Sequence, residues 1–203
     1  IRTTMTPALL AGLALSVPTP ATTRTYANPI DIDYRYNWEQ LRAGISYRTG
    51  ADPVVVPHKG HFYLFQTLAD GYWVSDDLVD WRFVKPNLWP FDSMVAPAGW
   101  SDGEKVYLRR SQMAPGAILS SSDPSTGQWE FFTRLTEKIP GAVMEVEIAK
   151  MKRGDLPPGP WDSQFFKDDD GRWYMYWGSS NVYPLYGIEI DHARGFAHVG
   201  KPQ

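Results

Sequence analysis

The feature that most constrains the fold is a loose internal repeat of three units beyond Trp38. Each unit opens with an apolar segment, turns, and returns as an aromatic segment, which reads "FYLF", "VYLR" and "WYMY" in the three units. The turns read "HKGH", "SDGE" and "DDGR". Glycine after Lys or Asp is a strong hairpin signal, because glycine adopts a positive φ without a steric penalty. Each unit is therefore predicted to begin with a β-hairpin.

A third apolar segment follows each hairpin. In the first two units, Ser- and Asp-rich turns at residues 75–81 and 121–129 then lead to a Trp that begins a fourth strand. Four antiparallel strands per unit are typical of a β-propeller blade. The turn glycines Gly60 and Gly103 are 43 residues apart, close to the roughly 40 to 50 residues of common propeller repeats. The sequence predicts an all-β propeller with blades at about residues 45–90, 91–135 and 160–203.

The spacing between the second and third units is longer, at 68 residues from Gly103 to Gly171. The extra residues are assigned to the segment 136–160, which is predicted to form a loop on one face. Known propellers close with about 4 to 8 blades. We therefore expect further blades in the native protein, and an exposed apolar flank on the third blade without them.

The amino-acid composition agrees with short strands and many turns. Trp, Tyr and Phe make up 14% of the 203 residues, and there are 17 Gly and 17 Pro. A formal charge of −3 without a run of Lys and Arg argues against nucleic acid or an anionic membrane as a partner. The absence of Cys excludes disulfides, thiol nucleophiles and cysteine metal sites.

The first 27 residues are interpreted as a signal peptide or a disordered N-terminal segment. Arg2 precedes the apolar run "PALLAGLALSV", and the proline-rich "PTPATTRTYA" follows it. This order is typical of a secretory signal, and the run is too short to span a membrane as a helix. A secreted or periplasmic location is therefore predicted.

Two carboxylates occupy equivalent places in the first and third units. Asp52 directly precedes the inner strand "PVVV", and Asp162 directly precedes "SQFF". The inner strand of a blade runs along the central channel, and its end reaches the ligand-binding face. Two carboxyl groups in one pocket are what glycosidic cleavage requires. The alternative is that each Asp only stabilises a turn.

Four stretches resemble the first three blades of glycoside hydrolase family 43: "GADPVVVPHKGHFYLFQT", "GYWVSDDLVDWRFV", "SMVAPAGWSDGEKVYL" and "GPWDSQFFKDDDGRWYMYWGSS". The resemblance implies a five-bladed propeller that hydrolyses arabinofuranosyl, xylosyl or galactosyl bonds of plant-type polysaccharides with inversion. It implies that Asp52 is the general base and that Asp162 modulates the pKa of a general acid. It also implies that this acid is a Glu of a fourth blade, beyond Gln203.

Two motifs depart from the family pattern. Asp162 is followed by Ser163 where the family usually has Pro, and Val95-Ala96-Pro97-Ala98 stands where the family often has Trp-Ala-Pro-Asp. The second change removes an aromatic residue and an acid, so a carbohydrate-binding propeller without catalytic activity remains an alternative. A protein-interaction propeller is a third reading, which the polar, aromatic-rich pocket strands disfavour.

Other candidates for the site come from their places beside the inner strands. Phe91 and Asp92 precede the second inner strand, where a sugar could stack and form hydrogen bonds, and Gln66 and Asn181 follow strands of the first and third blades. These four are the predicted substrate-binding residues. Glu145 and Glu147 could replace the missing acid, but a solvated loop explains them better.

No metal and no cofactor are predicted for the chemistry, although a structural calcium in the complete propeller is left open. None of the four histidines has metal-site spacing, and His58 and His61, which flank the first turn, are expected to be exposed. The acidic run 168–170 is read as a solvated turn rather than a calcium site. Trp residues that recur in the blades are expected between blades; they are Trp73, Trp81, Trp129 and Trp173.

Overall fold

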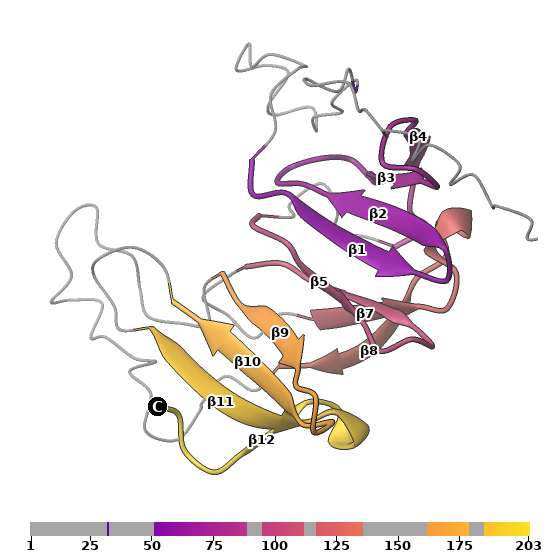
Figure 1. Ribbon diagram of the computed structural model, residues 1–203. Coiled ribbons are helices and arrows are strands. Elements are labelled where there is room, and N and C mark those ends of the chain that lie inside the picture. The colour runs from indigo at the N-terminus through magenta and orange to yellow at the C-terminus, as the bar shows by residue number, and fades with distance from the viewer. Residues whose placement is uncertain (1–31, 33–50, 89–94, 112–116, 136–161, 179–184) are drawn as a thin grey trace, which may run out of the picture.

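The computed structural model describes residues 32, 51–88, 95–111, 117–135, 162–178 and 185–203. These residues form three four-stranded antiparallel sheets, arranged side by side like the blades of a fan (Figure 1). In each sheet the strands lie in chain order, from an inner to an outer strand. The predicted all-β architecture of three propeller-type blades is therefore confirmed. Within these ranges, no helix is long and apolar enough to cross a membrane.

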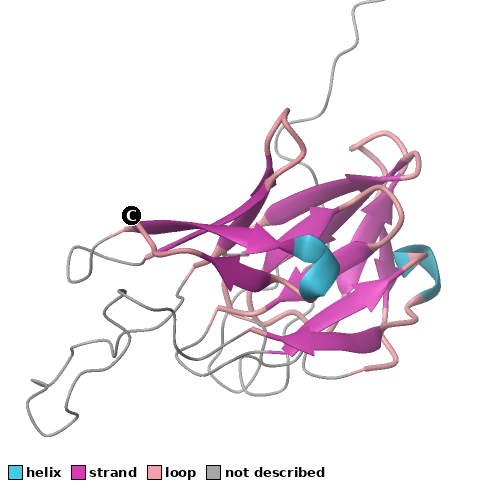
Figure 2. Ribbon diagram, turned by 90° about the horizontal axis from the view of Figure 1, so that it is seen from below, coloured by secondary structure: helices cyan, strands magenta, loops and turns pink. Residues whose placement is uncertain are grey.

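The bounds of the elements are as follows. The first blade contains β1 (Val54–His58), β2 (His61–Phe65), β3 (Tyr72–Ser75) and β4 (Arg82–Val84). The second contains β5 (Ala98–Ser101), β6 (Val106–Arg109), β7 (Ala117–Ser121) and β8 (Glu130–Arg134), with the 3₁₀ helix η2 (Pro124–Thr126) before β8. The third contains β9 (Gln164–Lys167), β10 (Trp173–Trp177), β11 (Tyr186–Asp191) and β12 (Ala197–Val199), with η4 (His192–Arg194) before β12. Figure 2 shows both 3₁₀ helices in the turns between strands.

The three predicted hairpins are present. His58 pairs with His61 across the first turn, where Lys59 and Gly60 adopt φ angles of 47° and 85°. Gly103 and Gly171, at the equivalent turns, adopt φ angles of 99° and 86°. All three turns thus use the left-handed conformation that glycine permits.

The third blade has the predicted fourth strand, β12, although no Trp marks its start in the sequence. Asp191 caps the preceding helix η4 by accepting a hydrogen bond from the Arg194 N–H, and Gly195 ends it with a φ of 68°. Asp123 and Gly127 cap and end η2 of the second blade in the same way. The second and third blades therefore have the same type of turn before their outer strands.

The inner strands β1, β5 and β9 lie next to one another, so the blades meet most closely at this edge. Gly99 of β5 permits the contact with β1, because a Cβ atom there would lie 2.8 Å from Val56 Cγ2. Between the second and third blades, the ring of Trp100 stacks on Phe165 with 3.8 Å between centroids. Aromatic side chains of both blades thus fill this interface.

The first and second blades are also joined by polar groups inside their shared core. The buried Tyr72 hydroxyl donates a hydrogen bond to the Pro124 carbonyl and accepts one from Trp129 Nε1 at 3.0 Å. Burial raises the pKa of this hydroxyl far above its ordinary value. It therefore stays protonated and satisfies both groups.

The expectation that His58 is exposed is wrong. Its exposed fraction is only 4%, because the second blade covers it. Its Nδ1 lies 2.8 Å from Ser101 Oγ and its Nε2 lies 3.4 Å from the Ser122 carbonyl. His61 is partly exposed, and its Nδ1 lies 2.5 Å from Asp76 Oδ1.

The recurring Trp residues divide into two groups. Trp129 and Trp173 are buried in the cores between blades, as predicted. Trp73 is buried in a separate cluster of the first blade, and the partly buried Trp81, Phe83 and Ile32 pack against that cluster. The inter-blade location is thus confirmed for two of the four, and the other two pack on the opposite side of the first sheet.

A partly buried histidine ties the third blade to the second. His192 stacks on Trp173 with 4.8 Å between centroids, and its Nε2 lies 3.4 Å from Asp102 Oδ2. The two atoms are within ion-pair distance but do not have the geometry of a hydrogen bond. Burial lowers the pKa of His192, with a smaller contribution from Lys167, while Asp102 and Asp191 oppose the shift. The folded protein therefore favours the neutral imidazole.

The free energy of unfolding is expected to fall as the pH is lowered through about 6.5, the ordinary pKa of His192. The unfolded chain binds the proton more readily there, so protonation stabilises the unfolded state relative to the folded one. Urea unfolding at a series of pH values from 8 to 5 measures the fall. His192→Phe should flatten it, and an unchanged slope in His192→Phe would contradict the assignment.

Candidate functional site

Three residues occupy the same strained position at the entrance to the inner strands. Asp52, Ala96 and Asp162 each stand two residues before an inner strand, and their φ angles are 50°, 41° and 47°. Left-handed backbone is uncommon for residues other than glycine and costs roughly 1 kcal/mol or more. Its recurrence in all three blades shows that the blade architecture imposes it. Both predicted catalytic residues thus hold equivalent places, and Ala96 takes that place in the second blade.

These positions lie at one end of the blades. β1 and β9 run in the same general direction in Figure 1, with their starts on the left and the hairpin turns on the right. Asp52 and Asp162 are both exposed. The strand starts therefore bring two solvent-accessible carboxylates to the same end of the fan.

Thr67 holds the carboxylate of Asp52. Its hydroxyl donates a hydrogen bond to Asp52 Oδ2 at 2.6 Å and accepts one from the Ala96 N–H at 2.8 Å. Its own N–H donates to the Ala51 carbonyl at 3.0 Å. Thr67 therefore connects the site residue of the first blade to the backbone of the second.

Ser111 holds Asp162 from the second blade. Its hydroxyl donates to Asp162 Oδ1 at 2.9 Å and accepts from the Asp162 N–H at 2.7 Å. Its N–H donates to the Val95 carbonyl at 2.7 Å. Ser111 is buried, so this connection lies beneath the exposed carboxylate.

A buried cation contacts Ser163, the residue that follows Asp162 in the sequence. The fully buried Arg109 donates a hydrogen bond from Nη1 to Ser163 Oγ at 2.5 Å. Burial, with a smaller contribution from Arg110, lowers the pKa of Arg109 to about 10, so the guanidinium is still charged at neutral pH. Ser163, which departs from the family's Pro, supplies a hydrogen-bond acceptor that Pro lacks.

The other departure lies at the start of β5. Ala98, where the family motif often has Asp, is only 1% exposed and packs in the core between the second and third blades. Ala96, not Ala98, is the residue equivalent to Asp52. The second blade therefore places no carboxylate at the left-handed position.

The remaining predicted residues are placed as follows. Gln66 is partly exposed at the same end as Asp52, directly before Thr67. Phe91, Asp92, Asn181, Glu145 and Glu147 lie outside the described residues, as do the N-terminal segment 1–27 and the loop 136–160. The acidic run 168–170 forms the β9–β10 turn at the opposite end, where Asp170 pairs with Arg172 at 2.6 Å. In the described part of the chain, no three His, Asp or Glu side chains gather as a metal site.

Thr67, Ser111 and Arg109 are site residues that the sequence did not reveal. Thr67 and Ser111 each stand two positions after the second strand of their blade. Aligning the first two blades by their second strands would have revealed this shared hydroxyl position from the sequence. Its partners, however, come from other segments and from the neighbouring blade.

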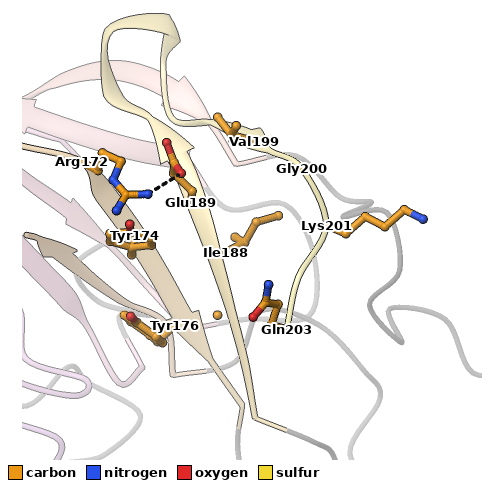
Figure 3. A pocket seen from close by; sticks show the side chains of 10 residues that line it. Arg172, Tyr174, Tyr176, Ile188, Glu189, Val199, Gly200, Lys201 and Gln203 are labelled. Atoms are coloured by element: carbon orange, nitrogen blue, oxygen red, sulfur yellow. Dashed lines mark hydrogen bonds and ion pairs between the residues drawn. The ribbon is translucent and has the colours of Figure 1, made fainter.

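A cavity of about 560 Å³ lies away from the carboxylates, on the outer flank of the third blade (Figure 3). Tyr174, Tyr176 and Glu189 line it, and Arg172 Nη1 lies 3.5 Å from Glu189. Tyr174 holds the same place in its sheet as the buried Tyr63 and Tyr107 of the other blades. We therefore interpret the cavity as part of the surface that packs against a neighbouring blade in the other two blades, and not as the catalytic site.

Exposed aromatic rings on this flank support that reading. Phe166 and Tyr176 are 51% and 50% exposed. Phe166 is equivalent to Trp100 and Val56, which are buried against the next blade. The predicted exposure of an apolar flank on the third blade is thus confirmed.

Comparisons with known proteins agree with the geometry. Neither a protein-family model nor a curated protein sequence matches the chain. Among solved structures, xylan β-1,4-xylosidase from Bacillus halodurans C-125 matches 88% of this chain with 33% of its own, at 16% identity and a TM-score of 0.54. A family 43 arabinoxylan arabinofuranohydrolase from Bacillus subtilis, in complex with cellotetraose, matches 88% of this chain with 42% of its own, at 17% identity and a TM-score of 0.54.

A family 43 β-1,3-galactosidase with galactodeoxynojirimycin is also similar, covering 83% of this chain and 64% of its own at 15% identity and a TM-score of 0.52. The chain thus spans about one third to two thirds of the length of these structures. At these identities the likeness shows the fold. The predicted resemblance is confirmed at that level: the chain has the blade architecture of the family 43 glycoside hydrolases.

Proposed function

We propose that this chain carries the general base and the pKa modulator of an inverting glycosidase. The observation that supports the proposal most is the equivalence of Asp52 and Asp162. Both carboxylates are exposed at the same end of the inner strands, both residues have a positive φ of similar size, and each carboxylate accepts a hydrogen bond from a hydroxyl group.

The proposed chemistry follows from these placements. Asp52 takes a proton from the water that attacks the anomeric carbon, and Asp162 sets the protonation of a glutamic acid that protonates the leaving oxygen. That glutamic acid lies outside the described residues. In an inverting enzyme the base and acid carboxyls stand roughly 6.5 to 9.5 Å apart, which leaves room for the water. This chemistry requires only carboxyl groups and water.

The proposed substrate is a terminal arabinofuranosyl, xylosyl or galactosyl residue of a plant-type polysaccharide or oligosaccharide. The solved structures with the same fold include a xylosidase, an arabinofuranohydrolase and a galactosidase. Gln66, at the edge of the site, is a proposed contact for the sugar. A secreted or periplasmic location, which suits such a substrate, is proposed from the sequence of residues 1–27.

A second candidate is a carbohydrate-binding propeller without catalytic activity. Val95 and Ala98 favour it, because they stand where the family motif often has an aromatic residue and an acid. The first candidate requires hydrolysis, and the second requires sugar binding alone.

Aryl glycosides of α-L-arabinofuranose, β-D-xylose and β-D-galactose distinguish the two candidates. The full-length protein is expected to release the aryl group from at least one of them and to bind the corresponding free sugar. Release is measured by absorbance and binding by calorimetry. Binding without release would select the binding module, and neither binding nor release would overturn both candidates.

A further inference from the structure

We infer that Thr67 and Ser111 are positioning residues that hold both proposed catalytic carboxylates through one peptide group of the second blade. The inference rests on the proposed function for its catalytic meaning. Its structural content is a single chain of hydrogen bonds that begins at Asp52 and ends at Asp162.

The chain can be followed atom by atom. The Thr67 hydroxyl donates to Asp52 Oδ2 and accepts from the Ala96 N–H. The carbonyl of the same peptide group, that of Val95, accepts from the Ser111 N–H. The Ser111 hydroxyl then donates to Asp162 Oδ1. Six residues from three blades thus form one connected path, and its four hydrogen bonds measure 2.6 to 2.9 Å.

The central peptide explains what the second blade contributes. The N–H and C=O of a trans peptide lie in one rigid plane and point in opposite directions. Ala96, whose N–H is part of this peptide group, has a left-handed backbone with a φ of 41°. The second blade therefore acts at the site through its backbone, at the position where the other two blades present a carboxylate.

The effect on the carboxylates is to fix their orientation. Hydrogen bonds to a charged acceptor are about twice as strong as neutral ones, so each hydroxyl favours one rotamer of its Asp. At Asp52 the bond engages Oδ2, and the exposed carboxylate keeps a second oxygen for the attacking water. At Asp162 the backbone N–H is held by the same Ser111 oxygen, so side chain and main chain are fixed together. Linked hydrogen bonds also polarise and strengthen one another.

Thr67→Val tests the catalytic part of the inference, because valine keeps the shape of threonine and removes its hydroxyl. We expect kcat in the full-length protein to fall by about 10- to 100-fold with little change in KM, since small misplacements of a reacting group cost about this much. Thr67→Ser keeps the hydroxyl and should restore kcat to within about threefold. Ser111→Ala should act in the same direction through Asp162.

Two remote hydroxyls in η2 provide matched controls. Thr126 Oγ1 donates to the Asp123 carbonyl at 2.7 Å and accepts from the Gln128 N–H, so Thr126→Val removes the same kinds of bonds as Thr67→Val. Ser125 Oγ donates to Asp123 Oδ1 at 2.6 Å, so Ser125→Ala matches Ser111→Ala. Both controls should leave kcat and KM unchanged.

A second measurement needs no catalytic activity. Three-bond NMR couplings across the Cα–Cβ bond of Asp52 should report one χ1 rotamer in the wild type and averaging in Thr67→Val. Thr67→Ala replaces Thr67→Val if the valine variant does not fold. A single rotamer in the variant, or wild-type kcat in Thr67→Val, would overturn the inference. If the wild type hydrolyses no glycoside, the proposed function fails, and the couplings alone still decide whether Thr67 positions Asp52.

Discussion

Asp52→Asn is expected to lower kcat for glycoside hydrolysis by about 10²- to 10⁴-fold, the usual contribution of a general base. Asparagine has nearly the same shape as aspartate and can still accept the hydrogen bond from Thr67, but it cannot take a proton from water. Because Asp52 is exposed and packs little, the fold should be intact. Steady-state kinetics, with circular dichroism as a check of the fold, measure both effects.

The matched control is Asp169→Asn, which changes an exposed carboxylate in the β9–β10 turn at the opposite end of the blades. It should leave kcat unchanged. Asp162→Asn should differ from both, because in the proposed mechanism Asp162 acts on the general acid, so the substitution should shift the alkaline limb of the pH–rate profile. Near-normal hydrolysis by Asp52→Asn would remove Asp52 from the mechanism.

Trp100→Ala is expected to reduce the free energy of unfolding by about 3 to 5 kcal/mol, the usual cost of removing a large buried aromatic side chain. Trp100 is 5% exposed and joins the second blade to the third. Its ring stacks on Phe165 and meets Phe196 edge-on, with 5.3 Å between centroids. The substitution would remove these contacts and leave a cavity at the interface.

Urea unfolding followed by tryptophan fluorescence and by circular dichroism measures this loss. Phe131→Ala is the control, because that ring lies in β8 and is 58% exposed; its effect should stay within about 0.5 kcal/mol. A loss below about 1 kcal/mol in Trp100→Ala would show that blade packing depends little on this stack.

The sequence predicts the blades well because their determinants are local. Two adjacent residues, Lys59 and Gly60, specify the first hairpin turn, and this turn sets the antiparallel pairing of β1 with β2. The start of the outer strand β12 is less clearly marked, because Phe196 rather than a Trp precedes it, although Asp191 and Gly195 carry the signals of the turn.

The candidate site shows where local reasoning ends. Asp52 and Asp162 can be placed from the sequence because the repeat puts them at the same step before an inner strand. The roles of Thr67 and Ser111 depend on hydrogen bonds to residues 15 to 51 positions away in the sequence, and two of these bonds cross between blades. His58 was expected at the surface for the same reason: its covering groups, Ser101 and Ser122, belong to the next blade. Contacts of this kind appear only once the blades are packed.

The stereochemistry of the product, compared between the wild type and Asp52→Asn, tests the central claim most directly. Proton NMR can follow the anomeric signal of the sugar that the full-length protein releases, before mutarotation mixes the two forms. The account predicts that the first-formed sugar has the inverted configuration and that Asp52→Asn releases almost none. Retention of configuration, or an inverted product formed at the wild-type rate by Asp52→Asn, would contradict it.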